Sequence, residues 1–186
     1  MMIRALVAAI VLVAPAAHAA PPAWTVDKGA SKLGFASQAG GQAFSGVFRR
    51  WDAAIRFDPN DLAHSSVAVT VDMTSAFSGN GDRDTLLPDE DWFWTSHFPR
   101  ATFTANRFTA QGAGRYAAAG VLTLRGVAKP LTLPFALAIT GPSAKMNAKV
   151  DLNRLAFGVG QGDWKTTDTV PATVTVTVDL TAHRAP

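Results

Sequence analysis

A strict alternation of apolar and polar residues is the feature that most constrains how this chain folds. It is clearest over residues 170–182, where valine, alanine or leucine fills every even position and threonine most of the odd ones. Successive side chains of a β-strand point to opposite faces, so the pattern predicts a strand with one buried and one solvated face. Residues 67–73 and 131–139 repeat the pattern.

Weaker alternation brings the number of predicted strands to about eight, with glycine, proline and asparagine marking the turns between them. The five further segments are 31–37, 44–57, 101–109, 115–125 and 144–152. We therefore predict an all-β fold with one domain over residues 20–186. Alternation alone leaves a closed barrel and a two-sheet sandwich open, although a closed barrel has the advantage that it exposes no strand edge.

Residues 1–19 have the three regions of a cleavable signal peptide. Arg4 supplies the positive charge, an apolar run follows over residues 5–14, and Ala17-His18-Ala19 offers small residues at the two positions that a signal peptidase needs. A membrane anchor is the alternative, but a spanning helix needs ~20 apolar residues and this run stops at Pro15. We expect cleavage before Ala20 and a periplasmic location.

One long segment, residues 80–99, does not alternate. It carries acidic residues ahead of three adjacent aromatic residues, Trp92, Phe93 and Trp94. We predict a short helix that begins after Pro88, has carboxylates at its N-terminal end and covers one end of the barrel. The aromatic residues then either gate the barrel mouth or pack the helix onto it.

The stretch Leu122–Pro130, LTLRGVAKP, is typical of a hairpin. Gly126 suits a turn that requires positive φ, and Pro130 is expected at the first residue of the returning strand. This stretch resembles the YceI-like family of polyisoprenoid-binding proteins, and the resemblance covers most of the chain. The other matching motifs, in the family's order, are Trp24–Asp27, Ser31–Phe35, Gly46–Phe48, Arg83-Asp84, Asp91–Phe93, Phe98–Ala101, Asn153-Arg154 and Phe157–Gly160.

The resemblance implies an exported, eight-stranded antiparallel lipocalin-like β-barrel, in which a long apolar pocket accepts a polyprenyl chain, a quinone precursor or a similar amphiphile. The chain departs from the family in the non-alternating segment, residues 80–99, which is called the insert below. Leu86-Leu87 stands where a His-Leu pair is common, and Trp92-Phe93 replaces Phe-Phe. Both changes make the insert more apolar, and they put in doubt any contact between the family's histidine and a ligand head group.

A lipid pocket in such a barrel would be lined by the inward residues of the strands and by the insert. The same residues would fill the core of a barrel that binds nothing. The predicted lining residues are Phe35, Phe48, Val69, Val71, Trp92, Phe93, Phe103, Leu122, Leu124, Leu133, Phe135, Leu137, Met146, Phe157, Val174 and Val176.

Arg83, Asn153 and Arg154 are the candidates for contact with a polar head group. Each also suits a local role, a helix cap for Arg83 and a turn for Asn153 and Arg154, and these roles are the more frequent ones. We expect a long-chain lipid as the ligand, transient contact with a membrane, and a monomer or homodimer. The basic residues are scattered along a chain of net charge +3, which does not indicate a nucleic-acid surface.

The sequence offers little for catalysis. It contains no cysteine, hence no disulfide and no thiol nucleophile, and its histidines show no metal-ligand spacing. We predict no catalytic residue, no metal and no cofactor other than a bound lipid. The expected function is a carrier or reservoir for an isoprenoid or quinone-like lipid. The alternative is an enzyme acting on such a lipid, with His97 and a carboxylate such as Asp84 or Asp91 as an acid–base pair.

Overall fold

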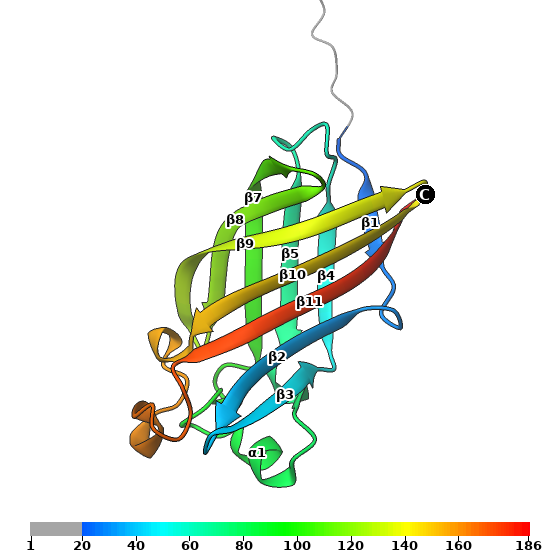
Figure 1. Ribbon diagram of the computed structural model, residues 1–186. Helices are drawn as coiled ribbons and strands as arrows, with labels where there is room; N and C mark the ends of the chain where they lie inside the picture. The colour runs from blue at the N-terminus through cyan, green and yellow to red at the C-terminus, as the bar shows by residue number, and fades with distance from the viewer. Residues whose placement is uncertain (1–19) are drawn as a thin grey trace, which may run out of the picture.

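The computed structural model describes residues 20–186 and shows a closed antiparallel β-barrel (Figure 1). The predicted signal peptide, residues 1–19, lies outside the described residues. The strands are Ala23–Val26 (β1), Lys32–Ala39 (β2), Gln42–Phe48 (β3), Trp51–Arg56 (β4), Ser66–Asp72 (β5), Ala76–Phe77 (β6), Arg100–Gly112 (β7), Arg115–Leu124 (β8), Val127–Thr140 (β9), Ser143–Asn153 (β10) and Thr173–Arg184 (β11). The helical segments are α1 (Gly81–Leu86) and the 3₁₀ turns η1 (Met73–Ser75), η2 (Arg154–Phe157) and η3 (Gly162–Lys165).

Eight strands close the ring, in the order β1-β4-β5-β7-β8-β9-β10-β11, because β11 pairs again with β1. β2 continues along β11 beyond β1, and β3 pairs with β2 and β6. Figure 1 shows β9, β10, β11, β2 and β3 as successive oblique strands, with α1 at the lower end of the molecule. The predicted eight-stranded barrel is confirmed, and the sandwich alternative is wrong.

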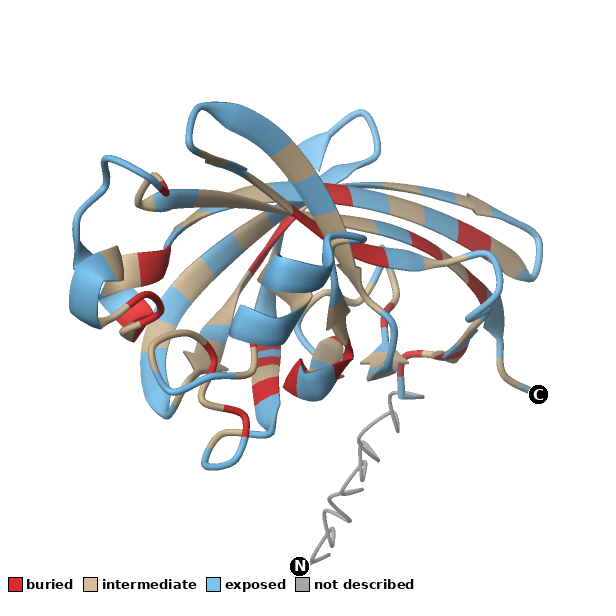
Figure 2. Cartoon of the chain, turned by 90° about the horizontal axis from the view of Figure 1, so that it is seen from below, coloured by how far each residue is buried: buried red, intermediate tan, exposed pale blue. Residues whose placement is uncertain are grey.

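Alternation places the apolar side chains inside this barrel. Along β9, the odd residues from Leu131 to Ile139 are half-buried and the residues between them are exposed, which gives alternating bands along the strands in Figure 2. Pro130 is the fourth residue of β9, so its expected position at the strand start was wrong. Over residues 127–134 β9 pairs with β8 alone, and a strand stretch with one unpaired edge tolerates proline.

The predicted strand over residues 44–57 is broken at Arg49-Arg50 into β3 and β4. The β2–β3 ladder ends at the pair Gly34↔Val47, and the β1–β4 ladder ends at Trp24↔Ile55. Between these two pairs, no ladder joins β2 to β4 in the described residues. The wall of the barrel therefore contains a gap at this point.

The helix of the insert precedes Pro88, so the prediction of a helix after Pro88 was wrong. Asn80 caps α1, because its side-chain oxygen accepts a hydrogen bond from the Arg83 amide at 3.0 Å. Residues 88–98 form turns instead. The sequence signal of carboxylates at a helix start applies to Asp82 and Asp84, about two helical turns earlier than expected.

Candidate functional site: apolar cavities inside the barrel

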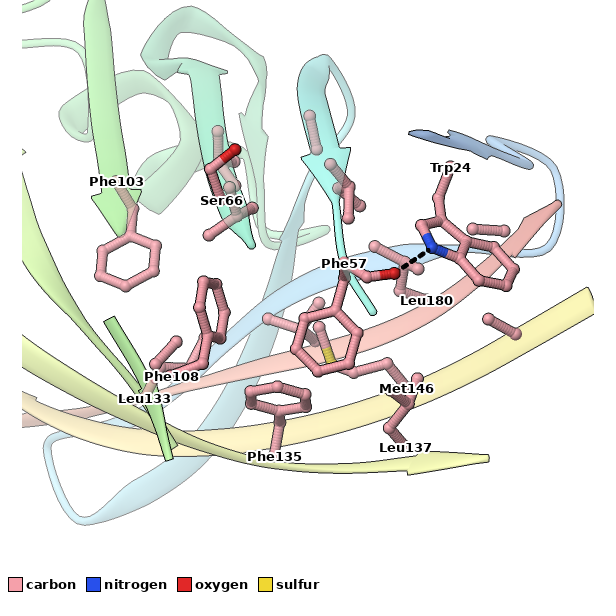
Figure 3. Close-up of a pocket in the computed structure, with 18 of the residues that line it drawn as sticks. Trp24, Phe57, Ser66, Phe103, Phe108, Leu133, Phe135, Leu137, Met146 and Leu180 are labelled. Carbon is pink, nitrogen blue, oxygen red and sulfur yellow. Dashed lines mark hydrogen bonds between the residues drawn. The ribbon is translucent and has the colours of Figure 1, made fainter. Parts of the chain in front are cut away.

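The interior of the barrel holds two apolar cavities. The first has a volume of about 130 Å³ and lies near the chain termini, where Trp24, Phe57, Phe135 and Leu180 belong to its wall (Figure 3). Phe57 packs edge-on against Phe135 with ring centroids 6.0 Å apart. The Trp24 indole N–H donates to the Phe57 carbonyl at 2.9 Å, so the polar atom of this tryptophan is satisfied beside the apolar space.

The second cavity has a volume of about 200 Å³ and lies toward the α1 end, where Phe93 and Phe157 contribute to its wall. Five residues, Leu33, Val69, Phe103, Leu133 and Val178, line both cavities. The two spaces therefore adjoin along the barrel interior, and together they offer an elongated volume with apolar walls.

All sixteen predicted lining residues lie on the walls of these cavities. Val69, Phe103 and Leu133 line both cavities. The predicted residues that line only the first cavity are Phe135, Leu137 and Met146. Those that line only the second cavity are Phe35, Phe48, Val71, Trp92, Phe93, Leu122, Leu124, Phe157, Val174 and Val176. Their contact with a ligand stays a prediction.

Sequence reasoning missed several lining residues at the first cavity. Trp24 lies on a four-residue strand that is too short to show alternation, and Phe57 follows the last residue of β4. Phe108 was within a predicted strand but was not assigned to the interior. Leu33 was also within a predicted strand, and its alternation with Phe35 was the signal that could have identified it.

The three adjacent aromatic residues of the insert take three different environments. Phe93 is buried and packs on Phe48, with ring centroids 6.2 Å apart. Trp92 is half-buried beside Trp164 at 5.3 Å, and its buried indole N–H has no hydrogen-bond partner within residues 20–186. Trp94 is absent from both cavity walls and packs on His97. Two of the three therefore close the α1 end of the second cavity.

Arg154 also lines the second cavity, and its guanidinium is hydrogen-bonded to main-chain carbonyls. The residue is 3% exposed and has no carboxylate partner within residues 20–186. Its N–H groups donate to six main-chain carbonyls, those of Val159, Trp164, Thr166, Val170 and Pro171 at 2.7–3.1 Å and that of Gly160 at 3.5 Å. Burial lowers the pKa of the guanidinium. Nε donates to one carbonyl, the two N–H groups of Nη1 to two, and the two N–H groups of Nη2 are shared among three, so every N–H of Arg154 faces a carbonyl and the side chain holds the 154–171 loop together.

The other two head-group candidates also serve local structure. Arg83 donates to the Ser78 hydroxyl at 3.0 Å and lies over the Phe44 ring at 3.8 Å. The side chain of Asn153 accepts from the Leu155 amide at 3.0 Å and caps η2. Neither residue belongs to the wall of either cavity. A contact between these residues and a ligand stays a prediction.

The structure does not bring together the residues of the enzymatic alternative. His97 is exposed, with its Nδ1 atom 3.3 Å from the Ser96 hydroxyl, and Asp84 accepts hydrogen bonds from Ser78 and Gly79. No hydrogen bond or ion pair joins His97 to Asp84 or Asp91 in the described part of the chain. Residues 20–186 also contain no cluster of three metal-ligating side chains and no helix long and apolar enough to cross a membrane.

A closed antiparallel barrel around an apolar interior is the architecture of proteins that enclose a small hydrophobic molecule. The chain belongs to the YceI-like domain family, whose model matches residues 24–182. The crystal structure of BcnA from Burkholderia cenocepacia is similar, with 30% identity and a TM-score of 0.81 over 84% of this chain and 98% of that one.

Two other proteins extend the comparison. A polyisoprenoid-binding domain from Saccharophagus degradans shares the fold, with a TM-score of 0.70 and 15% identity over 88% of this chain and 99% of that chain. A UPF0312 protein of Photorhabdus laumondii is 35% identical over 88 residues, which are 47% of this chain and 45% of that protein. The matched region thus spans about half the length of such curated relatives.

Proposed function

We propose that this protein is an exported carrier or reservoir that binds the chain of a long isoprenoid lipid, or of a quinone-like amphiphile, inside the barrel. The observation that carries the proposal is the pair of adjoining cavities with apolar walls. A barrel core without a ligand is normally packed to the density of a crystal, with few voids larger than a water molecule. Unfilled apolar space inside the barrel suits an apolar ligand.

The energetics favour a long chain. Each buried CH₂ group contributes ~0.8 kcal/mol, so a chain of many carbons provides ample driving force even after its conformational ordering is taken into account. The polyisoprenoid-binding domain of Saccharophagus degradans, which shares this fold, supports the same ligand class. Shielding a lipid chain from water between two membranes is the role that such a barrel would serve. The signal peptide expected from residues 1–19 agrees with that role.

A binding measurement on paired variants tests the proposal. Val69→Phe adds a ring where the two cavities adjoin, while Thr70→Phe adds the same ring to the exposed face of the same strand. We expect Val69→Phe to weaken binding of a fluorescent polyprenol roughly tenfold or more, equal to ~1.4 kcal/mol, and Thr70→Phe to leave it unchanged. Affinity for this neutral probe should not depend on salt.

The lipid itself is identified by native mass spectrometry of protein purified from its own host. We expect a co-purified species whose mass matches an isoprenoid lipid. Failure of the wild-type protein to bind any polyprenol, or equal effects of the two phenylalanine substitutions on its binding, would contradict the proposal.

A further inference from the structure

A third pocket lies in the wall of the barrel, at the gap where the β2–β3 and β1–β4 ladders end. It has a volume of about 420 Å³ and differs from the two interior cavities in being lined by several charged residues. Four of its nine lining residues are cationic and none is acidic. The lining residues are Lys28, Ser31, Lys32, Leu33, Val47, Phe48, Arg49, Arg50 and Trp51.

Two of the four cations are neutralised by neighbours. Lys28 forms an ion pair with Asp52 at 2.9 Å, and Arg50 forms one with Asp72 at 2.8 Å. These pairs leave the other two basic residues as the excess charge of the pocket.

Lys32 and Arg49 have no carboxylate within ion-pair distance in residues 20–186. Asp179 is the cross-strand neighbour of Lys32 on β11, and its carboxylate accepts a hydrogen bond from the Asn147 amide at 2.6 Å and forms no ion pair with Lys32. Arg49 lies over the Phe77 ring at 3.4 Å, a contact that leaves its charge uncompensated. The pocket therefore carries two positive charges without partners.

The basic pocket adjoins the interior through three apolar side chains. Leu33 lines the pocket and both cavities, Phe48 lines the pocket and the second cavity, and Trp51 lines the pocket and the first cavity. The arrangement therefore suits a molecule with a charged end and a long apolar chain. Its charged end would lie in the wall pocket, and its chain would pass these three residues into the interior cavities.

We propose that the wall pocket binds the phosphate of a polyprenyl monophosphate whose chain occupies the interior, an inference that rests on the proposed lipid-carrier function. A phosphate monoester carries nearly two negative charges and strong acceptor oxygens, which suit one arginine and one lysine. Among residues 20–186, Arg154 is the one cation that lines the interior cavities, and its donors are occupied by main-chain carbonyls. Lys32 and Arg49 are thus the head-group residues of this assignment.

Binding of two lipids that differ only in the phosphate tests the assignment. The full mature protein is titrated at low ionic strength with a long polyprenol and with the matching polyprenyl monophosphate. The variants are Lys32→Gln/Arg49→Gln and a control with the same change of charge, Lys145→Gln/Lys149→Gln, on exposed positions of β10. Inorganic phosphate at millimolar concentration serves as a competitor.

We expect the wild-type protein to bind the monophosphate roughly ten- to a hundredfold more tightly than the alcohol, as charge-assisted hydrogen bonds predict. The pocket variant should lose this preference and the control should keep it, while all three proteins bind the polyprenol equally. Added salt should reduce the preference, because the pocket is at the surface.

The possible failures are distinguishable. If the wild-type protein binds neither lipid, the carrier function itself is wrong. If it binds the polyprenol but shows no preference for the monophosphate, or if the pocket variant keeps that preference, the phosphate assignment alone is overturned. Inorganic phosphate that binds as tightly as the lipid would show that the pocket serves free phosphate and would also overturn the assignment.

Discussion

Neighbouring residues of the insert contribute to the site in different ways. Phe93 belongs to the buried cluster around Phe157, whereas Trp92 is half-buried at the edge of the same cluster. A buried N–H group without a partner costs about 1–3 kcal/mol, so Trp92 is not held in place by its indole nitrogen. Its position depends on packing against Trp164 and on the Arg154 guanidinium, 5.6 Å from its ring, and of the two aromatic residues at the α1 end of the second cavity it is the one that a ligand would more easily displace.

We therefore expect Trp92→Ala to raise the rate of ligand release roughly tenfold while lowering the free energy of unfolding by less than the 3–5 kcal/mol typical of a fully buried tryptophan. Trp92→Phe is the matched control, because it keeps an aromatic ring while it removes the unpartnered N–H and the second ring of the indole, and it should lie closer to the wild type than Trp92→Ala in both quantities. Stopped-flow release and urea denaturation measure them. A large stability loss with an unchanged release rate would show that Trp92 is only a packing residue.

The β8–β9 hairpin shows why one short element carries the most distinctive motif of the chain. Arg125 and Gly126 form its turn with positive φ angles of 50° and 74°. Arg125 donates to the Glu90 carbonyl at 2.6 Å, and a Cβ atom on Gly126 would lie 2.6 Å from the Phe98 ring. The turn is therefore the surface on which the insert docks, in addition to being a connection between strands.

Two glycine substitutions separate these roles. Gly126→Ala should lower the free energy of unfolding by roughly 2–4 kcal/mol, because it combines backbone strain with overlap against Phe98. Gly141→Ala, in the β9–β10 turn, has a φ of 58° but no atom within 4 Å of the added carbon, so it should cost about 1 kcal/mol from strain alone. Equal losses in urea denaturation would mean that the insert does not pack on the hairpin.

At the scale of the whole molecule, carboxylates that hold loops together make the barrel sensitive to acid. Burial tends to raise the pKa of Asp84, but hydrogen bonds from the Ser78 hydroxyl and from the Ser78 and Gly79 amides, with the charge of Arg83, outweigh it and lower the pKa overall. The Thr74 hydroxyl and Arg50 lower the pKa of Asp72, against a smaller opposing effect of burial. A carboxylate whose pKa is lower in the folded state stabilises the fold above its unfolded pKa.

This stabilisation should be complete above about pH 5 and should disappear as the pH falls below about 4 through the folded pKa values. Asp84→Asn should cost roughly 1 kcal/mol at pH 7 and almost nothing at pH 2 relative to the wild type. Asp82→Asn, an exposed carboxylate on the same helix, is the control and should change little at either pH. Urea denaturation at both pH values measures the effects, and a cost for Asp84→Asn that persists at pH 2 would contradict this account.

The sequence by itself determined the strands and which side chains point inward, because alternation is a local property that each strand carries in its own residues. For that reason the thirteen predicted lining residues that belong to strands lie on cavity walls, whereas Trp92, Phe93 and Phe157 belong to no strand. The family resemblance added the closed barrel, which alternation had left open against a sandwich.

The tertiary structure decided what depends on residues that are distant in the chain. Arg154 has no free donor only because folding brings carbonyls as far along as Pro171 around it. Likewise, Lys32 and Arg49 share a pocket only because two ladders end on either side of the same gap. Hydrogen-bond partners and ladder ends are set by long-range contacts, and the local pattern of residues carries no record of them.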